Sequence, residues 1–208
     1  MKKNAFTLVE VMICLIIVAL LAIVMISNLK SKNFKEKSYI GAINKYIALA
    51  QETFSKITED QTACPTGSFM QKVSGTWQVT TYKSDGTSKI NATEFMNLFG
   101  QHIKFNSGVI NFCDNSGWCT DTTVKGAKLP GGAIIGISIG DVQDCREYYM
   151  PGETSPRTAP TVYDIATGQR QTEKCFGSFY IDANALDGPN NRGKDVFVIG
   201  IGKKGLAF

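Results

Sequence analysis

The sequence predicts an α+β protein in which one long N-terminal helix precedes an antiparallel β-sheet. Two observations lead to this fold class. The stretch from Phe6 to Ile26 contains a single charged residue, Glu10, and a helical apolar pattern follows it. From about residue 59 the chain is rich in glycine, and short apolar segments alternate with turn residues, as strands and their connections do. A length of 208 residues suits one globular domain plus one extra long element.

The apolar run predicts the first half of the helix. A run of about 20 apolar residues can span a bilayer, so we expect a transmembrane segment at about residues 6–27. Lys2 and Lys3 place the N-terminus in the cytoplasm and the rest of the chain outside. A secretory signal peptide would have a shorter apolar core followed by small residues, and no such site follows this run. The membrane helix alone leaves Glu10 unexplained, because a carboxylate in a membrane is costly and usually has a partner.

The second half of the helix is amphipathic. Apolar residues recur there at spacings of three and four, which places them on one helix face, and polar residues such as Lys45 and Glu52 lie opposite. We therefore expect an unbroken helix over residues 6–57 whose second half packs on the sheet. A coiled coil is the alternative, although the repeat is too short to require one. The apolar face consists of Ile40, Ile43, Ile47, Ala50, Phe54 and Ile57.

Residues 58–208 are expected to form an extracytoplasmic, β-rich globular domain. Trp77–Tyr82 alternates and leads into Ser84-Asp85-Gly86, which predicts a strand and a hairpin turn. The segment Pro151–Gln171 is rich in Pro, Gly and Thr and predicts a surface excursion. Further strands are predicted at Gly108–Cys113, Ala133–Ile139, Phe176–Ile181 and Val196–Ile201.

A short helix is predicted at Ala92–Phe99. Asn91 and Glu94 have the spacing of a capping box at its start. Gly100 suits its C-terminal end.

Five cysteines follow the apolar run, and Cys14 lies inside it. Cysteines scattered through an exported, glycine-rich domain indicate disulfides and an oxidising compartment, with free buried thiols as the alternative. Connectivity cannot be deduced from sequence. We take Cys113 with Cys119 as the easiest loop to close and Cys145 with Cys175 as the next pair, which leaves Cys64 unpaired.

The N-terminal residues resemble the class III signal of type IV prepilins and pseudopilins. The pattern of that family is a short basic leader, a small residue, Phe-Thr-Leu-x-Glu and an apolar helix. Here Ala5 is followed by Phe6-Thr7-Leu8-Val9-Glu10, and the resemblance covers about the first 30 residues. It implies the pilin-like fold, with a long helix packed on an antiparallel sheet.

The resemblance also implies how the chain is processed. A membrane prepilin peptidase would cut between Ala5 and Phe6, so that residues 1–5 are a leader peptide, and would methylate the new amino terminus. Glu10 would then pair with the amino terminus of a neighbouring subunit, since a buried charge is tolerable only when it is paired. The alternative is a glutamate that favours the helix macrodipole and reaches the membrane interface.

The function implied is a structural subunit of a type IV pilus or of a type II secretion pseudopilus. The alternative is a minor or tip pilin that acts as a ligand-binding module, in adhesion or DNA uptake. The implied partners are the membrane, other pilin or pseudopilin subunits, the prepilin peptidase and assembly platform proteins. The implied location is the inner membrane, as a single-pass protein with a cytoplasmic N-terminus, and then the filament.

Two departures from the family pattern bear on this role. Most members have Gly where this chain has Ala5. Many major pilins have a proline where this chain has Ser27, and the first proline here is Pro65. These departures favour a minor pilin or a pseudopilin.

The segment between the last two long strands is rich in hard oxygen ligands. Calcium takes six to eight oxygen ligands in flexible geometry, which suits this composition, and Gly188 and Gly193 permit sharp turns. The loop resembles the Asp- and Asn-rich C-terminal loop of many pilin-like proteins. The alternative is a polar turn whose side chains bond their own backbone. The candidate Ca²⁺ ligands are Asp182, Asn184, Asp187, Asn190 and Asp195.

We expect no enzymatic activity and no other cofactor. His102 is the only histidine, and no motif of serine hydrolases, zinc proteases or phosphate-binding loops is present. Cys113 and Cys119 lack the second ligand pair that a zinc site needs. The net charge of +4 owes half its excess to Lys2 and Lys3, so no nucleic-acid partner is indicated.

Overall fold

The structure is a computed structural model that describes residues 8–29, 32–81, 89–151, 153, 155–165, 167–187 and 190–208. The chain divides into two compact units, Met1–Ser38 and Tyr39–Phe208. Helix α1 covers Leu8–Leu29 and helix α2 covers Lys32–Glu59. The predicted unbroken helix over residues 6–57 includes positions outside the described residues, so its continuity stays a prediction. The predicted leader, residues 1–5, also lies outside them.

From Val11 to Ile26, helix α1 consists of apolar residues on all sides. Ten of its large apolar side chains, between Val9 and Leu21, are 46–64% exposed. Such a helix has no polar face that would suit water. Among the described residues, however, no helix is both long enough and apolar enough to cross a membrane. The predicted span at residues 6–27 is therefore not found in that part of the chain.

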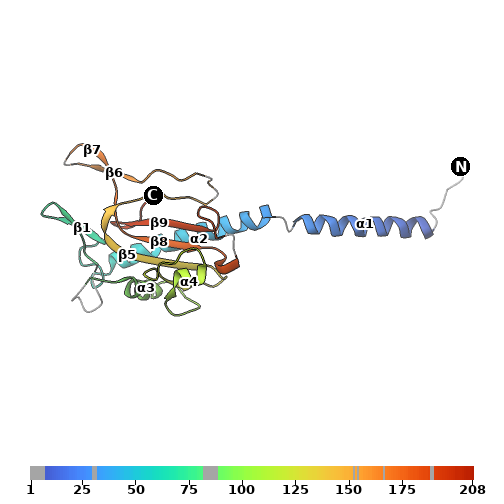
Figure 1. The fold of residues 1–208 in the computed structure, drawn as a ribbon, viewed down its shortest axis with the longest axis horizontal. Helices are drawn as coiled ribbons and strands as arrows, with labels where there is room; N and C mark the ends of the chain where they lie inside the picture. The colour runs from blue at the N-terminus through green and yellow to red at the C-terminus, as the bar shows by residue number, and fades with distance from the viewer. Residues whose placement is uncertain are drawn as a thin grey trace. The chain divides into compact units, whose positions relative to one another are not determined.

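A six-stranded antiparallel sheet forms the centre of the second unit (Figure 1), which confirms the α+β class with antiparallel pairing. Its strand order is β10-β9-β8-β5-β4-β3. The longest strands, β5, β8 and β9, lie side by side in the middle. The bounds are Ile110–Asn111 for β3, Lys125–Lys128 for β4, Ile134–Asp144 for β5, Lys174–Asp182 for β8, Val196–Gly202 for β9 and Gly205–Leu206 for β10.

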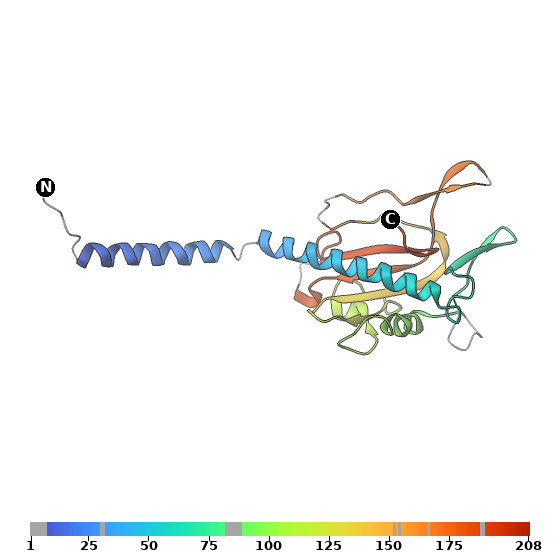
Figure 2. The same cartoon turned by 180° about the vertical axis from the view of Figure 1, so that it is seen from behind.

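The part of α2 that belongs to the second unit lies along one face of this sheet (Figure 2). The predicted apolar face is buried from Ile43 to Ile57, and Ile40 is half-buried. The Phe54 ring lies 5.8 Å from the Phe179 ring of β8, and the Gln51 side chain accepts a hydrogen bond from the Leu206 amide of β10. Burial of this face follows from the helical spacing of the apolar residues.

Helix α3, Ala92–Gly100, packs its Phe95, Met96 and Phe99 into the same core. The predicted capping box is present, since the Asn91 side chain accepts from the Glu94 amide and the Glu94 carboxylate accepts from the Asn91 amide. Gly100 is the last helical residue and Gln101 is the C-cap. A Cβ at Gly100 would lie 2.7 Å from the Phe105 ring, so this close approach requires glycine.

The strand predicted at Gly108–Cys113 is largely wrong. Only Ile110–Asn111 pairs, as β3, and Phe112–Ser116 forms the short helix α4. Gly117 ends α4 in the left-handed conformation at φ 66°, which glycine adopts at no steric cost. The Gly117 amide donates to the Cys113 carbonyl, which closes the turn, and the Phe112 side chain at the start of α4 is fully buried.

The predicted strands in the second half of the chain are confirmed. β5 starts one residue later and ends five residues later than predicted, β8 is longer at both ends, and β9 is one residue longer. Near Trp77 the strand β2 covers only Thr76–Val79 and pairs with β1, Met70–Val73, which the sequence did not predict. The β1–β2 turn is Ser74-Gly75, and both residues have positive φ. The turn predicted at Ser84-Asp85-Gly86 lies outside the described residues, as does Tyr82.

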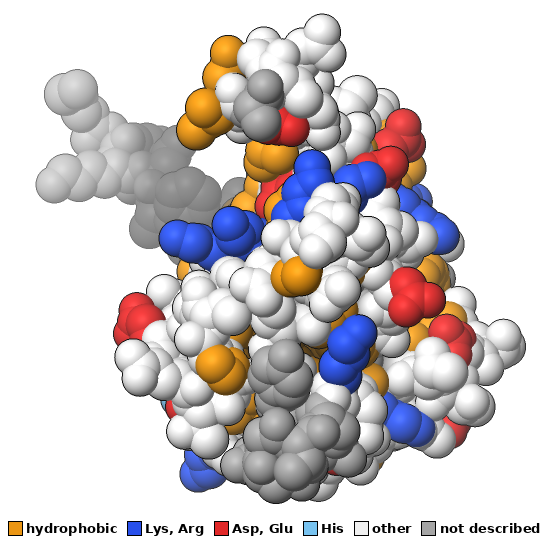
Figure 3. Space-filling view, turned by 90° about the vertical axis from the view of Figure 1, so that its left-hand side faces the viewer, with side chains coloured by type: hydrophobic (Ala, Val, Ile, Leu, Met, Phe, Trp, Pro, Cys, Tyr) orange, Lys and Arg blue, Asp and Glu red, His pale blue; other side chains and the backbone are white. Residues whose placement is uncertain are grey.

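The predicted surface excursion contains a two-stranded hairpin of β6, Thr161–Asp164, and β7, Gln169–Thr172. Apolar side chains gather on it at the top of Figure 3. Val162, Tyr163 and Ile165 are exposed there, Ile165 to 90%. Elsewhere on the face in Figure 3, basic and acidic side chains are interspersed.

Candidate functional site

The N-terminal candidate residues fall in and before α1. Glu10 is the third residue of α1, so its backbone lies in the first turn of the helix. Ala5 and Phe6 lie outside the described residues. The described part of α1 offers a continuous apolar surface that the chain leaves exposed, and Glu10 is the only acidic residue in this helix. The apolar surface of such a helix can be buried only against lipid or against other apolar protein surfaces.

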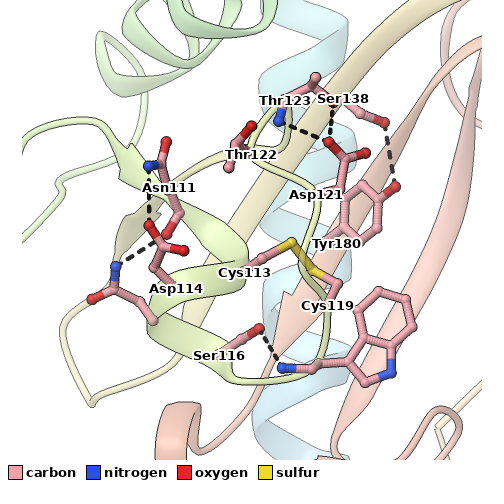
Figure 4. The surroundings of a disulfide bond; sticks show 12 residues. Asn111, Cys113, Asp114, Ser116, Cys119, Asp121, Thr122, Thr123, Ser138 and Tyr180 are labelled. Carbon is pink, nitrogen blue, oxygen red and sulfur yellow. Dashed lines mark hydrogen bonds between the residues drawn. A yellow bond between two sulfur atoms is a disulfide. The ribbon is translucent and has the colours of Figure 1, made fainter.

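Cys113 and Cys119 form a disulfide with Cα atoms 4.8 Å apart. Figure 4 shows that it ties the C-terminal arm of a loop back to α4. The Ser116 hydroxyl accepts a hydrogen bond from the Trp118 amide, and Asp121 accepts two from Thr123. The loop is therefore held by several local bonds.

The second predicted pair is also joined. Cys145 follows β5, Cys175 lies in β8, and their disulfide spans a sequence separation of 30. Cys14 and Cys64 are unpaired among the described cysteines. Burial raises the pKa of the Cys64 thiol to about 11, so this buried thiol is unreactive at neutral pH.

Asp182 is the first residue of the predicted calcium loop. It ends β8 and is fully buried. Its Oδ1 accepts hydrogen bonds from the amides of Asn184 and Ala185, at 3.1 and 2.8 Å. Among the described residues, no donor bonds its buried Oδ2. Burial raises the pKa of Asp182 from 3.8 to about 7, the two amides lower it, and the charge of Asp195 raises it further.

Asp195 is equally buried, but both of its oxygens have partners. Oδ2 accepts from the Asn190 amide and Oδ1 from the Asn191 amide, each at 2.7 Å. Asn190 has a positive φ of 50°, which asparagine tolerates better than most residues. Within the described residues, its buried side-chain oxygen has no hydrogen-bond partner.

The five predicted calcium ligands therefore differ in their roles. Asp182 and Asn190 each keep a buried oxygen without a donor, whereas Asp195 caps its own turn. Asp187 is exposed at the end of the 3-10 helix η1, Ala185–Asp187, and the Asn184 amide bonds Asp182. The part of the chain that the structure describes holds no group of three His, Cys, Asp or Glu residues that could bind a metal. Gly188 lies outside that part.

Comparison with known proteins adds one finding. Residues 1–26 match the family described as the prokaryotic N-terminal methylation motif. This motif is the signature of type IV pilins and pseudopilins, which are structural rather than enzymatic proteins. Comparisons with curated proteins and with solved structures gave no match.

Proposed function

We propose that this chain is a structural subunit of a type IV pilus or of a type II secretion pseudopilus and that it assembles through its N-terminal helix. The observation that carries the proposal is the methylation motif at residues 1–26 together with the exposed apolar surface of α1. A subunit outside the membrane would leave that surface in water, at a cost of about 25 cal/mol for each Å². In the assembled filament, packing against the same helix of other subunits takes the place of the membrane and keeps the surface out of water.

In the proposed processing step, the prepilin peptidase cuts between Ala5 and Phe6 and the new amino terminus is methylated. Phe6 then carries a positive charge close to the start of α1. The Glu10 carboxylate of a neighbouring subunit neutralises this charge, because two opposite charges in apolar surroundings are tolerable only as a pair. The pairing also fixes how far one subunit is shifted along the next.

The proposed location follows from the same motif. Before assembly the subunit is anchored in the inner membrane, with its N-terminus in the cytoplasm and residues 58–208 outside. The two disulfides support an oxidising compartment for that domain. Assembly platform proteins and other pilin or pseudopilin subunits are the proposed partners.

The replacement Glu10→Val tests the assembly mechanism. The subunit should be processed and membrane-associated as before, but it should be absent from filaments sheared off the cells. The matched control is Glu52→Gln, which removes an exposed acid of α2 that pairs with Lys56 at 2.7 Å. An exposed pair of this kind contributes at most about 1 kcal/mol, so the control should assemble normally. Normal recovery of the Glu10→Val subunit would remove Glu10 from the mechanism.

The replacement Ala5→Leu tests the processing step separately. A larger side chain before the cut should leave the leader attached. Mass spectrometry of the mature protein reports both the first residue and the methyl group. A wild-type chain that begins at Met1 would contradict the proposal.

For the loop Asp182–Asp195 we propose Ca²⁺ as the ligand to test. The support is the buried Oδ2 of Asp182 and the buried side-chain oxygen of Asn190, which no described donor satisfies. Asp182 and Asn190 would hold the ion, with backbone carbonyls and water completing its shell. The bound ion would neutralise the buried Asp182 charge.

A further inference from the structure

The face of the sheet that α2 does not cover contains a hollow of about 260 Å³. Alternation along β8 explains the position of this hollow, since Phe179 and Ile181 point into the core while Ser178 and Tyr180 point to the other face. One side of that face is covered by Phe112 and Trp118, whose rings lie 5.4 and 6.1 Å from the Tyr180 ring. The hollow begins beside this aromatic group.

The backbone shapes the floor of the hollow. The pairing of β5 with β8 runs regularly to Ile139 and then shifts, so that Gln143 is the next residue to pair. A bulge of this kind bends its strand and redirects side chains. Gly200 on β9 adds space, and a Cβ there would lie 2.3 Å from the Cys175 sulfur. The remaining floor is small and polar, from Ser138 and Ser178.

Of the two disulfides in the described residues, one lines this hollow and the other closes the loop that carries Trp118, which lines it. Cys113–Cys119 fixes the loop that carries Trp118 to one rim. Cys145–Cys175 lines the hollow and fixes the segment that carries Gln143 and Glu147. Rims held in this way lose little conformational freedom when a ligand binds, which favours affinity.

We propose that this hollow is a binding site for one unit of a neutral saccharide. The aromatic rings of Trp118 and Tyr180 offer the negative faces on which the C–H groups of a sugar ring can pack. The hydroxyls of Ser138 and Ser178 and the amide of Gln143 offer both donors and acceptors for sugar hydroxyls. This inference is independent of the proposed assembly, which uses α1.

The charges at the hollow favour a neutral ligand over an ion. Arg146 and Arg192 line it together with Asp144 and Glu147, so the formal charges cancel. Arg192 donates to the Glu147 carbonyl at 3.1 Å, and Asp144 is paired with Lys174 at 2.6 Å. These contacts give some of the charged groups a partner within the protein, so a ligand would meet mainly the uncharged polar groups of the floor.

Tryptophan fluorescence can test the proposal because the chain has only two tryptophans. Trp77→Phe removes the one in β2, so that Trp118 becomes the only reporter. The full chain is kept in a zwitterionic detergent without a sugar headgroup. Maltotriose, cellotriose and triacetylchitotriose are the probes, with inorganic phosphate as the anionic comparison.

We expect a saturable change in emission with at least one trisaccharide and a dissociation constant on the order of 1 mM. In the Trp77→Phe background, Gln143→Ala and Glu147→Ala change exposed rim residues that are not needed for folding and should weaken binding at least threefold. Lys72→Ala on β1, outside the hollow, is the matched control and should bind as the parent does. Circular dichroism confirms that all variants are folded.

Three results would overturn the saccharide site. One is no saturable response to any of the three sugars. Another is a response that both rim variants leave unchanged. The third is a response to phosphate alone, which would make the hollow an anion site.

Discussion

Replacing Asp182 with asparagine separates the two interpretations of the loop that follows β8. Asparagine keeps a side-chain oxygen that can accept from the Asn184 and Ala185 amides, as Asp182 Oδ1 does at 3.1 and 2.8 Å. It removes the charge that burial makes costly. Without a metal ion, Asp182→Asn should therefore stabilise the protein at pH 8.

The magnitude follows from the pKa of Asp182, which burial raises from 3.8 to about 7. Between these values the folded chain binds a proton that the unfolded chain has lost, so the free energy of unfolding falls as pH rises. Stability from this group is fully present below pH 3.8 and is lost as pH rises through about 7. At about 1.4 kcal/mol per pH unit the full change is about 4 kcal/mol, and relaxation around the charge reduces it to roughly 2–4 kcal/mol.

The assay is thermal unfolding of the full chain in a chelating buffer at several pH values, with and without added Ca²⁺. A gain of 2–4 kcal/mol corresponds to an increase in Tm of roughly 5–12 °C at pH 8. At pH 4.5 the wild type carries the proton, and the two proteins should melt within a few degrees of each other. A variant that melts below the wild type at pH 8 in chelator would refute the buried-charge argument.

Calcium narrows the difference in Tm between the two proteins if the loop binds it. Added Ca²⁺ should then raise the Tm of the wild type by several degrees and leave that of Asp182→Asn unchanged, because an ion stabilises only the state that binds it. Asp114→Asn, which changes an exposed acid outside the loop, is the control and should respond to Ca²⁺ as the wild type does. Equal melting of the wild type with and without Ca²⁺ would retire the calcium hypothesis.

Three further changes test the fold of the second unit. Asn91→Ala removes the side-chain acceptor for the Glu94 amide and should cost about 1 kcal/mol, seen as a loss of a few degrees in Tm; no change would mean that the cap contributes nothing. Cys145→Ser with Cys175→Ser opens a link across 30 positions and should cost about 2–4 kcal/mol in denaturant unfolding, whereas equal stability under reducing and oxidising conditions would contradict this. Phe54→Ala removes a fully buried ring and should cost about 3–5 kcal/mol, and a loss below 1 kcal/mol would contradict the packing described.

Periodicity predicted the elements that bury one face. The spacing from Ile43 to Ile57 predicted the covered side of α2, and Asn91 with Glu94 predicted the start of α3, because both patterns are local. Strand β1 was missed because Gln71 and Lys72 interrupt its apolar residues and the hairpin is largely exposed. Its formation depends on the Ser74-Gly75 turn.

The failure at Gly108–Cys113 has a different cause. Alternating apolar residues there fit a strand, but the strand ends at Asn111 and α4 begins at Phe112. The local sequence pattern does not show how Phe112 packs, because its ring lies against Gly136, where a side chain would leave no space. A Cβ at Gly136 would lie 2.6 Å from the Phe112 ring. Contacts between residues so far apart in the chain cannot be deduced from either segment alone.

The candidate ligands show the same limit. The composition of the loop identified five residues with side-chain oxygens, but it does not determine the direction in which each side chain points. The Asp195 oxygens accept from the backbone of their own turn, and Asp187 is exposed. The hollow on the sheet face that α2 does not cover was not predicted. Its residues come from separate segments of the chain between Trp118 and Gly200.

The acidic residues of the chain illustrate one physical requirement met in different ways. A carboxylate removed from water needs donors or an opposite charge. Asp195 obtains two amide donors from its own loop, whereas Asp182 obtains donors for one oxygen only, so a proton or a cation must complete it. Glu10 stands alone among the apolar residues of α1, where the sequence supplies no cation. Because the requirement is the same, Glu10 would need an opposite charge from outside α1, and in the proposed assembly the amino terminus of a second, processed subunit would supply it.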